Sequence, residues 1–201
     1  MNQNTGYPER PTTKTVGLLV GATLVALAAS AELVLSEITH LSNPGSGLGC
    51  DLNPLIGCSS SLMSWQAHLL LGIPNALVGV GLYAGLAGVF LAWWGGRLPR
   101  WLPLLIETGL TASLALIFFF LQQSVTFFRT LCPFCLLVWG ATILIWIHLG
   151  AVLMRLGHLP WLPPGFRKFW TQQRWLLTIA VFLLIILIIA VMLPDKLMYL
   201  F

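Results

Sequence analysis

The cysteines are the residues of this chain with the most distinctive chemistry, and the four of them form two pairs. Cys50 and Cys58 have seven residues between them, whereas Cys132 and Cys135 enclose a Pro-Phe dipeptide. A thiolate attacks a disulfide through a mixed-disulfide intermediate, so two adjacent pairs can pass electrons from one to the other. Four cysteines allow three pairings. A relay would use more than one of them.

The two pairs lie in segments of different character. Turn-forming residues at 43–47 precede Cys50 and predict a loop that can move. Pro133 suits the first position of a helix, where a missing N–H costs nothing, so Cys132 and Cys135 are predicted to be held at a helix start. Free N–H groups and the helix dipole at that start would lower the pKa of the nearest thiol.

The elements that position these pairs are predicted to be membrane-spanning helices. The chain of 201 residues is 58% hydrophobic and 8% charged, which is too apolar for a water-soluble globule. A spanning helix needs about 20 apolar residues. Five segments meet that length: residues 16–36, 70–94, 101–121, 131–154 and 175–194. We therefore predict an all-α polytopic membrane protein without a soluble catalytic domain.

The basic residues predict the orientation of the helices. With the N-terminus in the cytoplasm, most of the ten lysines and arginines fall on the inner side, as the positive-inside rule requires. The residues placed inside are Arg10, Lys14, Arg97, Arg100, Arg155, Arg167, Lys168 and Arg174, and those placed outside are Arg129 and Lys196. All four cysteines then lie on the outer face. The net charge of +4 follows from this topology, so no nucleic-acid partner is predicted.

The same pattern predicts the organisation of the chain. Residues 1–15 form a cytoplasmic tail, 16–154 a four-helix catalytic bundle with an outer loop at 37–69, 155–174 a cytoplasmic loop, and 175–201 a fifth helix with a short outer tail. Residues 59–69 are expected to form a short interfacial helix. An alternative is that the first hydrophobic segment is a signal peptide, although its apolar run is long for one.

The spacing of the cysteines alone also allows roles other than a redox relay. Two structural disulfides could staple an exported loop, because exported thiols usually oxidise. A four-thiolate metal site is a further alternative, but seven intervening residues are unusual for zinc. A non-enzymatic transport or assembly protein would fit the structural disulfides.

Three motifs in order resemble the vitamin K epoxide reductase family. They are residues 49–59 (GCDLNPLIGCS), residues 72–75 (GIPN) followed by Gly79, and the CPFC motif followed by Trp139. The resemblance covers roughly residues 16–154. It implies a four-helix transmembrane bundle around a quinone, menaquinone or ubiquinone, which accepts the electrons. A disulfide-bond-formation protein B type of oxidase does similar work, but its Cys-x-x-Cys pair comes first.

The resemblance also implies roles for individual residues. Cys132 and Cys135 would be the redox centre, with Cys135 nearest the quinone, and Cys50 and Cys58 would be the shuttle that receives electrons from a thioredoxin-fold protein. Asn75 would hydrogen-bond a quinone carbonyl; the alternative is a capping or turn residue after a proline. Asp51 would act as an electrostatic or loop-positioning group, or as an ordinary solvated acid.

Two departures from the family pattern matter. Trp139 stands where vertebrate members have tyrosine, and its indole N–H could still donate to a quinone. Many bacterial members continue into a fused thioredoxin-like domain, whereas this chain stops at Phe201, so a separate periplasmic thiol oxidase is the expected partner. Glu32 and Glu107 lie within predicted spans, where an acid is functional by default. His68 and His148 are expected to be hydrogen-bonded packing residues rather than ligands.

Overall fold

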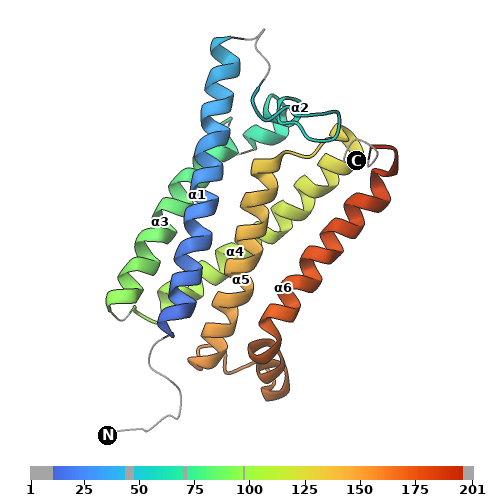
Figure 1. Cartoon of the computed structure of the whole chain (residues 1–201). Coiled ribbons are helices and arrows are strands. Elements are labelled where there is room, and N and C mark those ends of the chain that lie inside the picture. Colours follow the sequence, from blue (N-terminus) through green and yellow to red (C-terminus); the bar gives the residue numbers. More distant parts are fainter. Residues whose placement is uncertain (1–10, 44–47, 70–71, 97, 197–201) are drawn as a thin grey trace, which may run out of the picture.

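The computed structural model describes residues 11–43, 48–69, 72–96 and 98–196. Five long helices run through the molecule (Figure 1). They are α1 (Thr13–Ser42), α3 (Asn75–Gly95), α4 (Trp101–Gln123), α5 (Pro133–Arg155) and α6 (Pro164–Met192). Short elements complete the fold: α2 (Ser59–Leu62), the 3₁₀ helix η1 (Trp65–His68), and the π-helical turn η2 (Ser124–Phe128), which prolongs α4. The described residues form no strand beyond a single β-bridge.

Local chemistry fixes where the helices begin. The hydroxyl of Thr12 caps α1 by accepting the N–H of Thr15. Helices α5 and α6 both have a proline in the first turn. A backbone N–H at that position has no partner within the helix, so the N–H that proline lacks is not missed. Pro74 immediately precedes Asn75, the first residue of α3. Each start therefore follows from one or two residues of the sequence.

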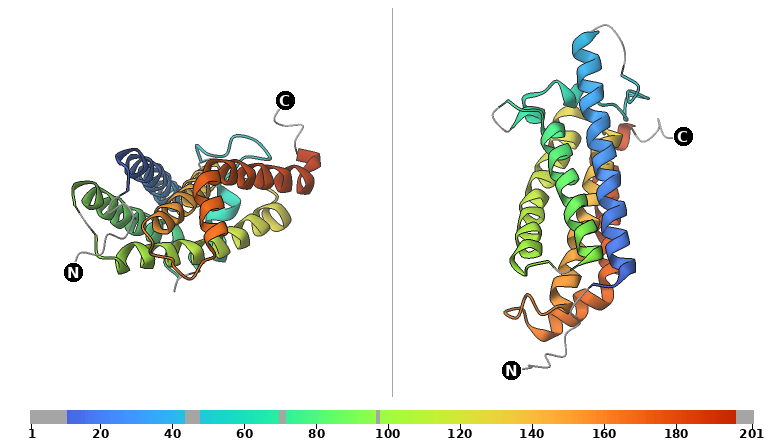
Figure 2. Two further views of the ribbon diagram at one scale, coloured as in Figure 1. Left: turned by 90° about the horizontal axis from the view of Figure 1, so that it is seen from below. Right: turned by 90° about the vertical axis from the view of Figure 1, so that its left-hand side faces the viewer.

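Helix α5 is the central element of the bundle. It packs against α1, α4 and α6, while α3 packs along α1. Viewed along the bundle, α5 lies between α1 and α6 (Figure 2). In the most apolar 18-residue window, 67% of α5 is buried against only 6% of α6. The cysteines at the start of α5 are thus held by the best-packed helix of the fold.

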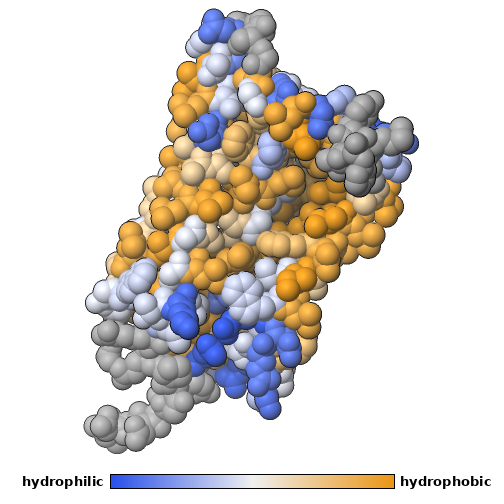
Figure 3. All heavy atoms as spheres, viewed as in Figure 1, coloured by the Kyte–Doolittle hydropathy of each residue, from blue (hydrophilic) through white to orange (hydrophobic). Residues whose placement is uncertain are grey.

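The outer surface of the bundle is apolar across its middle (Figure 3). Large aliphatic side chains of α6 are exposed there, including Leu183, Ile186 and Leu187. A continuous exposed apolar surface of this size requires lipid rather than water around it. All five long helices are long and apolar enough to cross a bilayer, so the prediction of an all-α polytopic membrane protein is confirmed.

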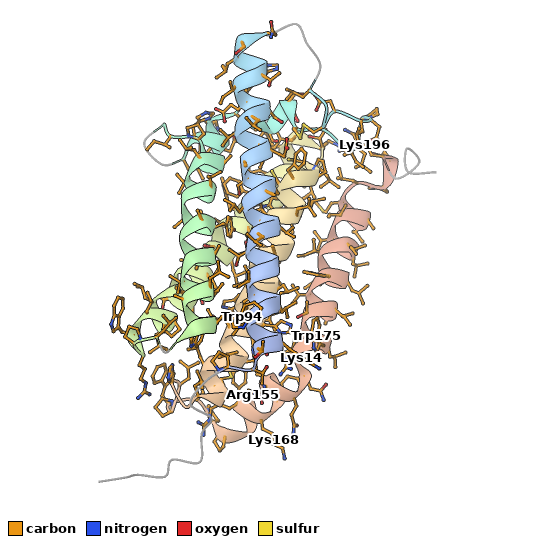
Figure 4. All side chains as sticks on the ribbon, turned by 60° about the vertical axis from the view of Figure 1, so that its left-hand side comes forward. Lys14, Trp94, Arg155, Lys168, Trp175 and Lys196 are labelled. Carbon is orange, nitrogen blue, oxygen red and sulfur yellow. A yellow bond between two sulfur atoms is a disulfide. The ribbon has the colours of Figure 1, made fainter. Side chains whose placement is uncertain are left out.

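The two ends of the bundle differ in composition. Lys14, Arg155 and Lys168 gather at one end, here called the basic end, with Trp94 and Trp175 nearby (Figure 4). Lys196 lies at the opposite end. The four cysteines also lie there, at the start of α5 and in the loop packed on it, and we call this the cysteine end.

Several helix bounds differ from the predicted ones. Helix α1 continues to Ser42 instead of ending at residue 36, since Glu37 is buried in the bundle and the Thr39 and Ser42 hydroxyls bond to carbonyls of the preceding turn. Helix α3 begins at Asn75, later than predicted, because Pro74 disfavours a helical conformation in the residue before it. Residues 70–71 lie outside the described part.

The segments predicted as a loop and as a single short helix also differ. Half of the predicted loop at 155–174 is helical, because α6 starts at Pro164 and bends at Gln173, whose φ of −102° and ψ of 16° are not helical. The predicted helix at 59–69 is instead divided into α2 and η1 by a break at Met63 and Ser64. The turn-forming residues 44–47 lie outside the described residues.

The two intramembrane acids singled out in the sequence have different surroundings. Glu32 is exposed on α1. Glu107 of α4 faces α5 closely, since a Cβ on Gly150 would lie only 2.8 Å from its Oε1. His148 is buried and its ring packs edge-on to Trp175 as expected, whereas its Nε2 has no hydrogen-bond partner among the described residues.

Candidate functional site

The first loop is closed by a disulfide between Cys50 and Cys58. Their Cα atoms are 5.8 Å apart, within the usual range for a disulfide. Oδ1 of Asp51 accepts the backbone N–H of Cys58 at 2.7 Å and that of Ser59 at 3.2 Å. A Cβ on Gly57 would lie 2.9 Å from the same oxygen, so the tight loop needs glycine there. Asp51 therefore holds the turn that carries Cys58.

The charge state of Asp51 follows from these hydrogen bonds. Partial burial by itself would raise the pKa of this carboxyl group, but the N–H groups of Ser59 and Cys58 outweigh burial and lower the pKa below its ordinary 3.8. Asp51 is consequently a carboxylate at neutral pH. Its hydrogen bonds to the loop are those that a loop-positioning group would make, and that role stays a prediction.

Backbone hydrogen bonds attach this loop to the segment before α5. The N–H of Leu131 donates to the carbonyl of Leu55 at 2.8 Å, and that of Gly57 donates to the carbonyl of Leu131 at 3.1 Å. Oδ1 of Asn53 accepts two N–H groups within the turn and stiffens it. At the far side Lys196 donates to the carbonyl of Pro54. The loop is thus fixed against the helix start.

Cys132 lies between the loop disulfide and Cys135. Its Sγ is 3.5 Å from Sγ of Cys58, and it accepts the backbone N–H of Cys135 at 3.3 Å. Cys132 is the N-cap of α5, and Pro133 occupies the first turn as predicted. The Cys135 thiol and the N–H groups at this helix start lower the pKa of Cys132, outweighing the effect of burial. Cys132 is the sulfur best placed to exchange with the loop.

Below the cysteines lies a cavity of about 290 Å³ within the bundle. Helices α1, α3, α4 and α5 form its wall, and α2 and η1 cover it at the cysteine end. Its apolar and aromatic lining includes Leu33, Leu62, Ile117, Phe120, Val138 and Trp139. Cys132 and Cys135 belong to the wall, whereas Cys50 and Cys58 do not. Cavities that bind small molecules are of this kind, with few polar groups in an apolar lining.

Two side-chain amides supply polar groups to the cavity wall. Asn75 connects α3 to η1: its Oδ1 accepts the N–H of Leu69 at 3.2 Å, and its Nδ2 donates to the carbonyl of Gln66 at 2.7 Å. The second N–H of Nδ2 is not needed for this connection. Gln66 is 4% exposed and donates to Gln123, but its Oε1 has no hydrogen-bond partner among the described residues. A buried acceptor without a donor is a site for a ligand hydroxyl.

The sequence profile of the Vitamin K epoxide reductase family matches residues 17–149. This chain belongs to that family. No curated protein and no solved structure gave a significant match. The matched region contains most of α1, all of α3 and α4 and most of α5, with all four cysteines and the cavity, and it ends before α6. Membership of the vitamin K epoxide reductase family makes the protein an oxidoreductase that works within a lipid bilayer.

The structure brings together most of the residues selected from the sequence. The four cysteines form one cluster, in which Cys50, Cys58 and Cys132 pack with Leu33, Leu48 and Leu62. Asn75 and Trp139 line the cavity, and Asp51 holds the loop above it. The described residues contain no group of three or more His, Cys, Asp or Glu placed to hold a metal ion.

Two residues of the site were missed in the sequence. Gln66 was treated as part of an interfacial helix, and Glu37 as the start of a loop. A signal for Glu37 exists: Ser30, Leu33 and Glu37 recur at helical spacing, and all three line the cavity. His68, expected to be a hydrogen-bonded packing residue, bonds to Glu37. The continuation of α1 beyond residue 36 is what places Glu37 in the site.

Proposed function

We propose that this member of the vitamin K epoxide reductase family is a quinone-linked thiol–disulfide oxidoreductase that reoxidises an exported thioredoxin-fold protein. Electrons enter at Cys50 and Cys58, pass to Cys132 and Cys135, and leave to a membrane quinone. The observation that carries the proposal is the 3.5 Å separation of the Cys58 and Cys132 sulfurs beside a cavity whose wall contains Cys135.

The first exchange takes electrons from the partner protein. The partner's dithiol reduces the Cys50–Cys58 disulfide and becomes a disulfide itself. The Cys58 thiolate then attacks Cys132 of an oxidised Cys132–Cys135 pair, which forms a Cys58–Cys132 bridge and releases the Cys135 thiolate. Cys50 attacks Cys58 in turn, restores the loop disulfide and releases Cys132. A bonded loop pair beside a free Cys132 and a free Cys135, the arrangement in this structure, is what the proposal expects after this step.

The second exchange occurs at the cavity. When bound there, a quinone supplies an acceptor for two electrons and two protons. Cys132 and Cys135 give up two electrons as they form their disulfide, which regenerates the starting state. The apolar wall excludes water around the sulfurs, and the remaining N–H of Asn75 and the indole N–H of Trp139 are the donors suited to carbonyl oxygens. Gln66 Oε1 suits the hydroxyl of the reduced product.

The charge distribution supports an orientation with the basic end in the cytoplasm. The cysteine end then faces the periplasm or exterior, where an exported thiol oxidase operates, and the membrane is the plasma or inner membrane. Both Cys50 and Cys58 are buried, at 5% and 0% exposure. The partner's attack therefore requires the loop to lift from the start of α5.

The proposal is tested with purified protein in lipid nanodiscs, a reduced thioredoxin-fold protein and decylubiquinone. Wild type should oxidise the partner and reduce the quinone in equal amounts. Cys132→Ala and Cys135→Ala should abolish quinone reduction, and Cys50→Ala and Cys58→Ala should abolish oxidation of the partner. If the disulfides were only structural, which is the alternative, the cysteine variants would be less stable than wild type. Wild type would then give no quinone reduction.

A further inference from the structure

A buried acid and a histidine connect the cavity wall to the surface at the cysteine end. Glu37 of α1 is 6% exposed and lines the cavity. Its Oε1 lies 2.9 Å from Nε2 of His68 in η1, and the His68 side chain is 29% exposed. One group of the pair therefore faces the cavity, and the other is accessible to water.

The hydrogen bonds of His68 show which of its protons can move. Nδ1 lies 3.2 Å from the carbonyl oxygen of Ser64. A carbonyl oxygen only accepts, so Nδ1 carries a hydrogen. Nε2 then either carries a second proton and donates to the Glu37 carboxylate, or is bare and accepts from the protonated carboxyl group. In both cases a single proton lies between Nε2 and Oε1, on the ring or on the carboxyl group.

The surroundings of His68 favour the protonated form of its ring. The carbonyl of Ser64 and the side chain of Glu37 raise the pKa of His68 above its ordinary 6.5. A ring in this state can give its proton to Glu37 and be protonated again from surface water. The pair is thus suited to repeated transfer in one direction.

The reaction proposed above needs such a proton. If Cys132 reacts as a thiolate and Cys135 as a thiol, the balance is thiolate plus thiol plus quinone plus one proton, giving a disulfide and a quinol. The two sulfurs supply both electrons, and Cys135 supplies one proton. The second proton has to reach the cavity from solution, and the mostly apolar lining contains few side chains that can carry it.

We infer that Glu37 and His68 form a proton-transfer pair that carries this second proton from the surface at the cysteine end to the quinone in the cavity. The inference rests on the proposed function. His68 takes the proton from water at its ring, and Glu37 receives it at Oε1 and delivers it to an oxygen in the cavity. Their ion pair also fastens η1 over the cavity.

Few other ionisable groups face the cavity. Helix α5 contributes Cys132 and Cys135, and α3 contributes Tyr83, whose hydroxyl bonds to Thr142 at 2.7 Å. On α1, His40 lies one turn beyond Glu37 and outside the cavity lining. Helices α2 and α4 and the turn η2 place no ionisable side chain among the described lining residues. Glu37 is therefore the carboxyl group available to act in the cavity.

The test uses Glu37→Gln and His68→Ala, with Glu32→Gln as the matched control, since Glu32 is an exposed acid on the same helix. Decylubiquinone reduction driven by dithiothreitol is measured as kcat and KM between pH 5.5 and 9. Reduction of the Cys132–Cys135 disulfide without quinone checks that each variant is folded. In quinone-free protein, nitrogen NMR of His68 shows directly which ring nitrogen titrates.

The inference requires that Glu37→Gln lower kcat about a hundredfold, the scale of a general acid, with KM and thiol exchange nearly unchanged. Added imidazole should restore activity to His68→Ala, and Glu32→Gln should match wild type. In the NMR experiment, Nε2 of His68 should titrate while Nδ1 keeps its hydrogen. A Glu37→Gln variant with the kcat and pH profile of wild type would overturn it, as would equal losses in thiol exchange and quinone reduction. Absence of quinone reduction in wild type would instead refute the proposed function.

Discussion

At the scale of single residues, the side-chain amides of Asn75 and Gln66 differ in how many of their hydrogen bonds are made within the protein. Asn75 and Gln66 both line the cavity, but Asn75 also joins η1 to α3, whereas Gln66 keeps one buried oxygen without a partner among the described residues. Substitutions at the two positions should therefore differ in their effect on stability even if both weaken quinone binding.

Gln66→Leu should raise the decylubiquinone concentration for half-maximal turnover by roughly threefold to tenfold, the value of one neutral hydrogen bond. Its thermal unfolding midpoint should stay close to that of wild type, because removal of the buried unpaired oxygen offsets the loss of the hydrogen bond to Gln123. Asn75→Ala should raise the same concentration and also cost about 1–3 kcal/mol, because the Leu69 N–H and the Gln66 carbonyl lose their partner. Equal unfolding midpoints for the two variants would contradict these assignments.

The ion pair between Glu37 and His68 makes the attachment of η1 depend on pH. Because the folded pKa of His68 is raised, its stabilising contribution is full below about pH 6.5 and is lost as the pH rises through the folded pKa. Amide hydrogen exchange at residues 65–69 should therefore accelerate, beyond the intrinsic pH effect, between pH 6 and pH 9. Glu37→Gln should remove that excess, and an unchanged excess would show that another group controls η1.

Much of the site could be predicted because many of its residues belong to short contiguous motifs. The cysteine pairs, Pro133 and the run around Asp51 are contiguous, so their local structure follows from neighbouring residues. Glu37 and Gln66 could not be recognised in this way. Their importance depends on contacts across the fold, between α1 and η1 and between η1 and the end of α4, which a one-dimensional pattern does not contain.

At the scale of helices, the close contact between α1 and α3 shapes one side of the cavity. A Cβ on Gly79 would lie 2.8 Å from Oγ of Ser30, so glycine allows the two helices to approach. By contrast, a Cβ on Gly85 of the same helix would meet nothing within 4 Å. The two glycines form a natural comparison.

Gly79→Ala should destabilise the protein by about 1–3 kcal/mol, because the helices must separate to admit the methyl group. Ser30→Gly should recover most of that loss in the double variant, while Gly85→Ala should be neutral or slightly stabilising since alanine favours the helix. Thermal unfolding in nanodiscs measures all four proteins. Additive effects of Gly79→Ala and Ser30→Gly would mean that the two side chains do not meet.

Helix ends were the least predictable part of the fold. The hydrophobic runs fixed the number and order of the five spans, yet α1 and α6 extend well past their apolar segments. Polar residues such as Thr39 and Ser42 continue α1, because their hydroxyls bond within the helix. Hydropathy measures where lipid must cover a helix, and it does not measure where the helix stops.

The whole molecule has chemically distinct ends, and the proposed orientation in the membrane rests on them. We predict that a membrane-impermeant thiol reagent will label Cys50 and Cys58 in reduced cells with a permeabilised outer envelope. A cysteine introduced at Lys168, at the basic end, should react only after the inner membrane is opened. Labelling of the introduced cysteine from outside would reverse the orientation proposed here.

The central claim is that the loop pair and the helix pair exchange electrons through Cys58 and Cys132. Cys135→Ser removes the sulfur that would otherwise resolve an attack at Cys132, so the Cys132 thiolate should attack Cys58 of the loop disulfide and remain joined to it. Non-reducing peptide mapping of Cys135→Ser during turnover with the reduced partner measures this most directly. The account predicts a Cys58–Cys132 bridge with Cys50 released as a thiol. A Cys50–Cys58 bridge that persists beside a free Cys132 would contradict it.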